Sequence, residues 1–297
     1  MDVKRPRLSE IELSAGVRTR LHRILYEFGP KNGTLLILPI DQGLEHGPED
    51  FFSNPDSSSM DYIFKLAIEG NFSAVACHIG LAEQYYPKYA GRMPLVLKLN
   101  GKTNIPSDAN AFSPLTGTVE DAVRLGADAV GYTLFVGSPK QDADIAQLNK
   151  VRQDCRRFGM PLIVWSYPRG SAIDEKGGKD SLYAVDYAAR VAEELGANIV
   201  KINMPKPPNE KCPKPYPSIQ EDDLARMKRV VKSAGKSLVL VSGGSKLGDE
   251  DLLHKVETAM QAGATGIIFG RNMWQREKKD ALEITKKVHA ILKKYGD

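Results

Sequence analysis

A lysine interrupts an apolar run in this chain, and it is well placed for covalent chemistry. Residues 196–203 read GANIVKIN, so Lys201 lies within what is otherwise the pattern of a buried strand. A buried ammonium group loses the solvation that stabilises its charge, so the amine tends to become neutral and nucleophilic. The alternative is a structural lysine whose tip reaches water or pairs with a carboxylate, and the rest of the sequence must decide.

Three other apolar runs carry side chains that could act beside such an amine. They are Asp41 at the end of residues 35–41, Lys98 within residues 94–100, and Tyr167 at the end of residues 161–167. Side chains two positions apart on a strand point to the same side. These three side chains and Lys201 can therefore all face one space while the opposite face of each strand stays apolar. The alternative is four unrelated polar residues that each reach water, and the agreement among four strands disfavours it.

This set of side chains suits Schiff-base chemistry. A neutral amine adds to a ketone, the resulting iminium withdraws electrons, and a neighbouring carbon–carbon bond can then break or form. A tyrosine or a carboxylate moves the proton. Two ammonium groups in one space repel each other, which lowers the pKa of one of them. These arguments leave open whether Lys98 or Lys201 is the nucleophile.

Two glycine-bearing segments predict a phosphate site. Ser242, Gly243 and Gly244 end one predicted strand, and Gly270 and Arg271 end the next. Glycine lets backbone N–H groups approach phosphate oxygens, and arginine adds a charged fork. Each segment alone could be an ordinary turn. Their positions matter because the loops after the last two strands of a barrel enzyme frequently bind phosphate.

Eight apolar runs of strand length, mostly separated by helical patterns, predict the scaffold. The strands are residues 35–41, 73–79, 94–100, 128–135, 161–167, 196–203, 237–241 and 266–269. Such alternation indicates a parallel sheet, and eight units in one chain close into a (β/α)₈ TIM barrel. Its chemistry would lie at the carboxyl ends of the strands. A doubly wound open sheet is the alternative, but residues 41–44 lack the G-x-G-x-x-G pattern expected after its first strand.

We expect one catalytic domain and a short extension. Residues 1–32 form an N-terminal helical extension that packs on the main body, and residues 33–297 form the barrel. A capping box at residues 218–221 predicts the start of a helix that runs to about residue 234. Residues 203–217 contain six prolines and predict a stiff loop that overhangs the catalytic face. A lid, a subunit contact or an ordinary surface insertion would each fit this loop.

The composition is that of a globular protein with a sizeable core. The 41 basic and 37 acidic residues nearly balance, so nucleic-acid binding is not indicated. No apolar run approaches the ~20 residues of a membrane span, and the first residues lack the apolar core of a signal peptide. Three widely spaced cysteines form neither a metal pattern nor an even disulfide set. We therefore expect a reducing, cytoplasmic setting without a membrane or nucleic-acid partner.

A metal-dependent enzyme is the obvious competitor of a Schiff-base enzyme. It would need clustered imidazole ligands, but of the five histidines only His46 and His78 lie near predicted strand ends. We expect no metal and no other cofactor. His46 is either a substrate contact or a capped loop histidine.

Six segments together resemble the archaeal-type class I fructose-1,6-bisphosphate aldolases, the DhnA-like family. They are DQGLEHGP at 41–48, LKLNGKT at 97–103, VWSYPRG at 164–170, VKI at 200–202, SGG at 242–244 and GRNMWQR at 270–276. They run through most of the chain in the order of the family, and the VWSYPRG segment is the most specific.

The resemblance implies a class I aldolase of glycolysis and gluconeogenesis that cleaves fructose 1,6-bisphosphate reversibly through a Schiff base. It implies Lys201 as the Schiff-base lysine, Tyr167 as the general acid/base and Asp41 as a ligand of the substrate hydroxyls. Trp165 would line the site, and Lys98 would be a charged neighbour. The segments at 242–244 and 270–271 would hold the phosphate nearest the ketone.

The resemblance also implies a homo-oligomer, often a decamer. The chain departs from the shorter archaeal members in its longer N-terminus and in the proline-rich loop at 203–217, two features outside the six matching segments. The nearest rival function is a related Schiff-base enzyme, such as a heptulosonate synthase or a thiolase of phosphorylated diones. A phosphosugar-binding protein without catalysis is a second rival.

Overall fold

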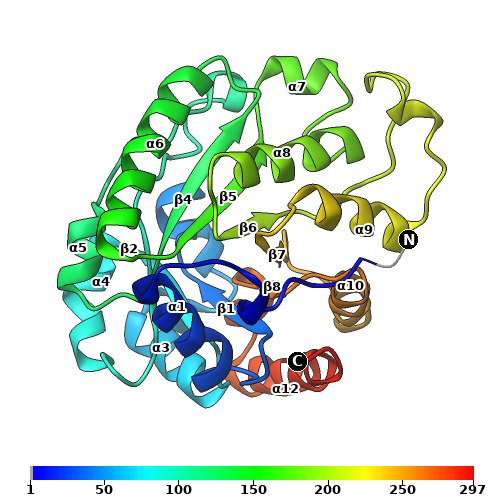
Figure 1. Ribbon diagram of the computed structural model, residues 1–297. Helices are drawn as coiled ribbons and strands as arrows, with labels where there is room; N and C mark the ends of the chain where they lie inside the picture. Colours follow the sequence, from blue (N-terminus) through cyan, green and yellow to red (C-terminus); the bar gives the residue numbers. More distant parts are fainter. Residues whose placement is uncertain (1–2) are drawn as a thin grey trace.

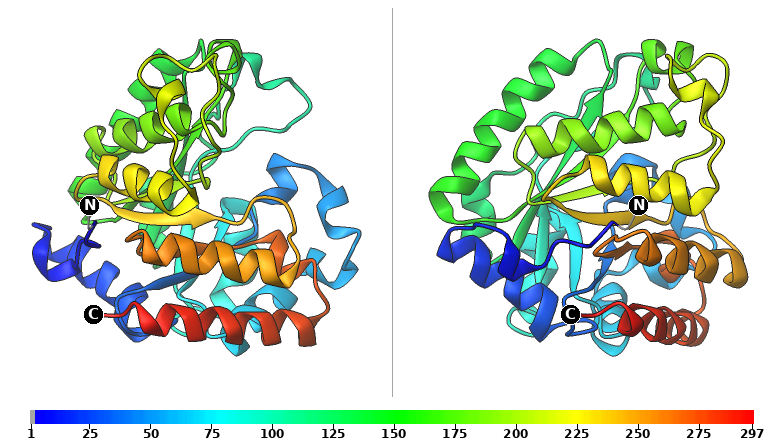
Figure 2. Two further views of the ribbon diagram at one scale, coloured as in Figure 1. Left: turned by 90° about the vertical axis from the view of Figure 1, so that its right-hand side faces the viewer. Right: turned by 45° about the vertical axis from the view of Figure 1, so that its right-hand side comes forward.

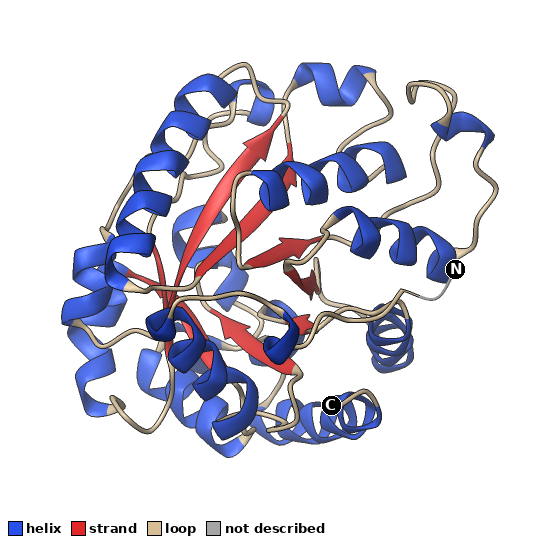
Figure 3. Ribbon diagram, viewed as in Figure 1, coloured by secondary structure: helices blue, strands red, loops and turns tan. Residues whose placement is uncertain are grey.

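The computed structural model of the protein describes residues 3–297 and contains a closed, all-parallel eight-stranded barrel (Figures 1 and 3). Met1 and Asp2 of the predicted extension lie outside the described residues. The strands are β1 (Leu35–Pro39), β2 (Ala74–His78), β3 (Leu95–Lys98), β4 (Ala129–Val136), β5 (Leu162–Pro168), β6 (Ile199–Ile202), β7 (Leu238–Ser242) and β8 (Gly266–Ile268). They pair in sequence order, and β8 closes the barrel on β1. The predicted barrel is confirmed.

Helices surround the barrel. They are α1 (Ala15–His22), α2 (Gln42–Glu45), α3 (Met60–Glu69), α4 (Ile79–Tyr85), α5 (Val119–Arg124), α6 (Gln141–Phe158), α7 (Ser171–Glu175), α8 (Leu182–Glu194), α9 (Asp223–Ser233), α10 (Asp249–Gln261), α11 (Arg271–Trp274) and α12 (Lys278–Lys294). Shorter helical turns include η2 (Arg23–Glu27), which continues α1, η3 (Pro48–Phe51) after α2, and η7 (Tyr216–Ser218) before α9.

Strand alternation separates two apolar clusters, as the sequence pattern predicts. Leu95, Leu97 and Val200 belong to the cluster between the barrel and its helices. Val96 and Ile199, on the opposite faces of the same strands, belong to a second cluster that fills the barrel interior. Because side chains alternate along a strand, the interior positions that follow toward the carboxyl ends carry the polar residues of the site.

The N-terminal segment closes one end of the barrel. Leu21, Ile24 and Leu25 are nearly fully buried, and they share a cluster with the interior residues of the strands. In the left view of Figure 2, this segment and both chain ends lie on one side of the molecule. The apolar face of α1 is therefore buried against the barrel, and the other end of the barrel is left for the site.

The predicted start of the helix after the proline-rich segment is wrong. α9 begins at Asp223, and the Asp222 carboxylate caps it by accepting a hydrogen bond from the Ala225 N–H at 2.8 Å. Ser218 lies in turn η7, where its hydroxyl donates to the Pro215 carbonyl at 2.7 Å. Serine hydroxyls compete for nearby backbone groups in this way, so the capping-box pattern did not produce a helix start.

The proline-rich loop contains no α-helix and no strand of the barrel, in agreement with its sequence. Its Tyr216 hydroxyl donates to Asp186 of α8 at 2.7 Å, and Lys206 forms a β-bridge with Ser181. The carboxyl ends of the strands surround a cavity, and residues 204–217 do not line it. Lys206 lines a separate depression beside this cavity. The loop thus lies beside the barrel mouth rather than over it.

Candidate active site

A cavity of about 230 Å³ opens at the carboxyl ends of the strands. Nine of the eleven predicted site residues line it: Asp41, His46, Tyr167, Lys201, Ser242, Gly243, Gly244, Gly270 and Arg271. The other two, Lys98 and Trp165, are fully buried beneath it. Residues that are far apart in the sequence therefore converge because barrel closure brings the strand ends together.

Lys201 is the central amine of this cavity. Its Nζ lies 4.8 Å from the centroid of the Trp165 ring and 5.4 Å from that of Tyr167. The pKa of Lys201 is lowered to about 8, because burial and the Lys98 ammonium group disfavour its charge more than Asp41 favours it. With a pKa near 8, roughly a tenth of the amine is neutral at pH 7. Lys201 can therefore act as a nucleophile near neutral pH.

Lys98 differs from Lys201 because carboxylates hold its charge. Its Nζ lies 2.5 Å from a Glu45 oxygen and 3.3 Å from an Asp41 oxygen, and the side chain is fully buried. Burial opposes the charge, but Glu45 and Asp41 outweigh it and the pKa of Lys98 is raised. Among residues 3–297, no carboxylate forms such an ion pair with Lys201. The two amines therefore differ in their ion pairs: Lys98 has two carboxylate partners, and Lys201 has none among these residues.

The Asp41 carboxylate stays ionised despite its burial. Desolvation raises its pKa, but Lys98 and then Lys201 act in the opposite direction, and the net pKa is lowered. The negative charge of Asp41 and Glu45 also acts on Tyr167. Burial raises the pKa of Tyr167, and these two carboxylates raise it further, so the phenol keeps its proton at rest.

The glycine-bearing loops lie at one end of the cavity. A Cβ on Gly243 would lie 2.6 Å from the Asn272 side-chain nitrogen, so a larger residue would push on the group that holds the loop. That nitrogen donates to the Ser245 carbonyl at 3.1 Å, and Asn272 also accepts from the Leu247 N–H at 2.8 Å. Arg271 adds a positive charge beside this loop. The arrangement suits a phosphate group.

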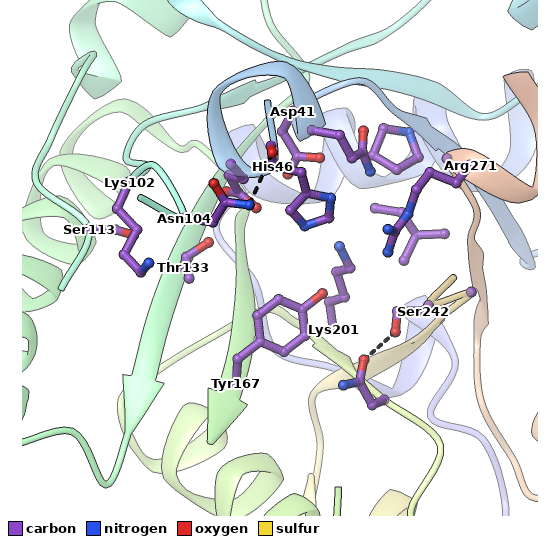
Figure 4. Close-up of a pocket in the computed structure, with 18 of the residues that line it drawn as sticks. Asp41, His46, Lys102, Asn104, Ser113, Thr133, Tyr167, Lys201, Ser242 and Arg271 are labelled. Atoms are coloured by element: carbon purple, nitrogen blue, oxygen red, sulfur yellow. Dashed lines mark hydrogen bonds between the residues drawn. The ribbon is translucent and has the colours of Figure 1, made fainter. Parts of the chain in front are cut away.

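A second basic group lies at the other end of the cavity. Lys102 and Arg169 both line it, and each lies 3.0 Å from an oxygen of Asp108. Figure 4 shows Lys102 and Arg271 on opposite sides of Lys201. The cavity can therefore receive an extended molecule with an anionic group at each end and a reactive carbon near the central amine.

Five charged residues in or beside this site were not predicted as site residues: Glu45, Asp50, Lys102, Asp108 and Arg169. Glu45 lies four residues after Asp41, a spacing that can bring two side chains to one side of a short helix. Arg169 lies two residues after Tyr167 and directly follows β5, so continued alternation of the strand would direct both side chains to the same side. For Asp50 and Asp108 no sequence signal exists, because they lie in helical turns of three or four residues, which are too short to show a periodic pattern.

Within residues 3–297, no group of three or more metal-binding side chains is arranged to hold a metal ion. No helix in that range is long and apolar enough to cross a membrane.

A sequence model of the DeoC/LacD family of aldolases matches residues 35–276, which contain all eight strands of the barrel. The chain belongs to this aldolase family. It is 41% identical to the class 1 fructose-bisphosphate aldolase of Thermoproteus tenax, over 90% of this chain and 91% of that one. It is 38% identical to the class 1 enzyme of Halobacterium salinarum, over 83% and 86%. These relatives are the same kind of aldolase that the six sequence segments resemble.

A solved structure of an archaeal fructose-1,6-bisphosphate aldolase has the same barrel. Its catalytic lysine is covalently bound to the carbinolamine intermediate of the substrate. It is 39% identical to this chain, covers 93% of it over its own full length, and superposes with a TM-score of 0.78.

Proposed function

We propose that this aldolase is a class I fructose-1,6-bisphosphate aldolase that uses Lys201 as its Schiff-base lysine. The observation that carries the proposal is the pairing of charges. Lys98 is held as an ammonium by two carboxylates, while the pKa of Lys201 is lowered to about 8 between two basic ends of one cavity. The relatives named class 1 fructose-bisphosphate aldolase support the same substrate.

In this proposal the substrate lies across the cavity in its open, ketone form. The phosphate on C1 binds at the glycine-bearing loops and Arg271, and the phosphate on C6 binds near Lys102 and Arg169. Both phosphate groups of the substrate are then paired with cationic side chains, and the C2 ketone lies near Lys201. Asp41 accepts hydrogen bonds from substrate hydroxyls.

Tyr167 carries the proton in each step. Lys201 adds to C2, and Tyr167 gives its proton to the departing water as the iminium forms. The resulting phenolate takes the proton of the C4 hydroxyl, the C3–C4 bond breaks, and glyceraldehyde 3-phosphate leaves. The electron pair of that bond remains on the enamine. Tyr167 then protonates C3. Water hydrolyses the iminium to dihydroxyacetone phosphate, which regenerates the amine and returns the released proton to the Tyr167 phenolate.

The raised pKa of Tyr167 fits this cycle because the cycle begins with a phenol. Trp165 packs against the amine: the centroid of its ring lies 4.8 Å from the Lys201 Nζ and 5.1 Å from the Lys98 Nζ. The covalent adduct takes the place of a metal or other cofactor in this mechanism.

The deciding experiment is borohydride reduction in the presence of dihydroxyacetone phosphate, followed by peptide mapping. We expect a stable adduct on Lys201 and none in Lys201→Met. An adduct on Lys98, or no adduct at all, would refute the assignment. A panel of sugar phosphates separates the bisphosphate aldolase from related Schiff-base enzymes, and activity that persists in a chelator rules out a metal-assisted reaction.

The remaining expectations belong to the same proposal. We assign the enzyme to the cytoplasm and to glycolysis and gluconeogenesis, as a homo-oligomer such as a decamer. Residues 1–32 form the extension and residues 33–297 the catalytic domain. Light scattering of the purified protein tests the assembly.

A further inference from the structure

We infer that Asp50 is a positioning residue: it holds His46 in one tautomer, with Nε2 as an acceptor for a substrate hydroxyl, and links it to the phosphate end of the cavity. This inference rests on the proposed function for the identity of the substrate. Neither the sequence pattern nor the resemblance assigns a role to Asp50, which lies in turn η3.

The first observation is the contact between the two side chains. The Nδ1 atom of His46 lies 2.7 Å from an oxygen of Asp50. A carboxylate only accepts hydrogen bonds, so Nδ1 carries the hydrogen in this contact. In a neutral imidazole the other nitrogen, Nε2, then presents its lone pair. The tautomer of His46 is thus set by Asp50.

The second observation is the direction of the imidazole. His46 lines the cavity, and Figure 4 shows its ring turned toward Lys201. Within residues 3–297, Nε2 has no hydrogen-bond partner in the protein. The His46 carbonyl accepts from the Asn104 side chain at 3.0 Å, which also fixes the backbone of this residue. The free lone pair therefore faces the space where the substrate hydroxyls would lie.

The third observation is the second partner of the same carboxylate. The other oxygen of Asp50 lies 3.7 Å from a guanidinium nitrogen of Arg271. The Asp50 side chain is 14% exposed, and its backbone carbonyl accepts from Gln275 at 2.7 Å. A phosphate that binds Arg271 must share this guanidinium with Asp50. One carboxylate therefore joins the anion-binding end of the cavity to the histidine above the amine.

The contacts of this loop also show that Asp50 is not its main anchor. The Phe51 ring packs on that of Trp274, with centroids 5.2 Å apart. The Asn54 amide donates to the backbone carbonyls of Trp274 and Arg276 at 2.8 and 2.7 Å. These contacts do not involve the Asp50 carboxylate, so its loss leaves the loop attached. A change at Asp50 therefore tests the carboxylate itself.

The test combines a tautomer measurement with kinetics on Asp50→Asn. An asparagine can donate its amide hydrogen to Nδ1 and hold the imidazole in the opposite tautomer. We expect ¹⁵N NMR of labelled histidine to show His46 protonated at Nδ1 in the wild type and at Nε2 in Asp50→Asn. His46→Gln identifies the resonance by its absence. Glu49→Gln is the matched control, because this neighbouring carboxylate is exposed and does not line the cavity.

Kinetics give the second readout. We expect kcat for fructose 1,6-bisphosphate to fall roughly tenfold to a hundredfold in Asp50→Asn, as for other residues that orient a functional histidine. In a His46→Gln background the same change should cause no further loss, because Asp50 acts through His46. Inorganic phosphate should shift the His46 signal in the wild type and not in Asp50→Asn.

Several results would overturn the inference. A wild-type His46 protonated at Nε2 would do so without any variant. An equal loss of kcat from Asp50→Asn in the wild-type and His46→Gln backgrounds would assign Asp50 a role independent of His46. A His46 signal that phosphate shifts equally in the wild type and in Asp50→Asn would show that Asp50 does not connect His46 to Arg271. The tautomer is measured without substrate, so these results are distinct from a failed borohydride adduct, which would refute the proposed function instead.

Discussion

Lys98→Met removes the buried ammonium group that pairs with both Asp41 and Glu45. In the wild type the Lys98 charge lowers the pKa of Lys201 and neutralises part of the charge on Asp41 and Glu45. Without it, the same carboxylates act on Lys201 alone and favour its ammonium form. We therefore expect the pKa of Lys201 to rise from about 8 toward the ordinary lysine value near 10.5 without reaching it, because burial, the largest cause of the lowered pKa, remains in the variant.

The size of the kinetic effect follows from the neutral fraction of the amine. At pH 7 a pKa of about 8 leaves roughly one amine in ten neutral, whereas a pKa of 10.5 leaves about one in three thousand. The rate of Schiff-base formation at pH 7 should therefore fall, by roughly 300-fold at most. The variant should also lose roughly 3 kcal/mol or more of stability, because the change leaves a buried carboxylate unpaired.

The assay is the pH dependence of kcat/KM for fructose 1,6-bisphosphate, together with the rate of borohydride trapping. In the wild type kcat/KM should rise with pH through about 8, because the neutral amine is the reactive form. In Lys98→Met this rise should move to higher pH, by at most about 2.5 pH units. Lys88→Met removes a lysine that is 65% exposed and serves as the control. A folded Lys98→Met enzyme with an unchanged pH profile would refute the electrostatic argument.

Three further substitutions test the same site. Lys201→Met should abolish cleavage and raise stability by up to about 3 kcal/mol at pH 7. The folded-state pKa of Lys201 near 8 lies below the unfolded value near 10.5, so the unfolded chain binds more protons between these pH values. The wild type should therefore gain stability as the pH rises from 8 to 10.5. Urea unfolding at several pH values measures this gain and the stability of Lys201→Met. Tyr167→Phe should lower kcat by roughly 10² to 10⁴ without preventing slow trapping at Lys201 in a mass-spectrometric assay, and near-normal turnover would contradict its role as the proton carrier. Arg271→Gln should raise KM by roughly tenfold to a hundredfold, because a charge-assisted bond to phosphate is lost, while saturating substrate still traps Lys201; an unchanged KM would place the phosphate elsewhere.

The barrel and the inward direction of the key side chains follow from local sequence patterns. The interior positions of β3, β5 and β6 alternate with apolar outward positions, so Lys98, Tyr167 and Lys201 could be assigned to one space before any contact was known. Successive side chains of a strand point to opposite faces even where both faces are buried, so the sequence alone shows which residues share a face. The glycines at 243 and 270 were likewise visible as breaks at strand ends.

The difference between the two lysines was decided by contacts that no local pattern contains. Glu45 reaches Lys98 across 53 positions of sequence from a helix of only four residues, and among the groups that raise the pKa of Lys98 it has the largest effect. The same is true of Asp50, which meets Arg271 across the seam between β1 and β8. Strand periodicity assigns a side chain to a face, whereas its charge depends on which distant groups barrel closure brings within a few ångströms.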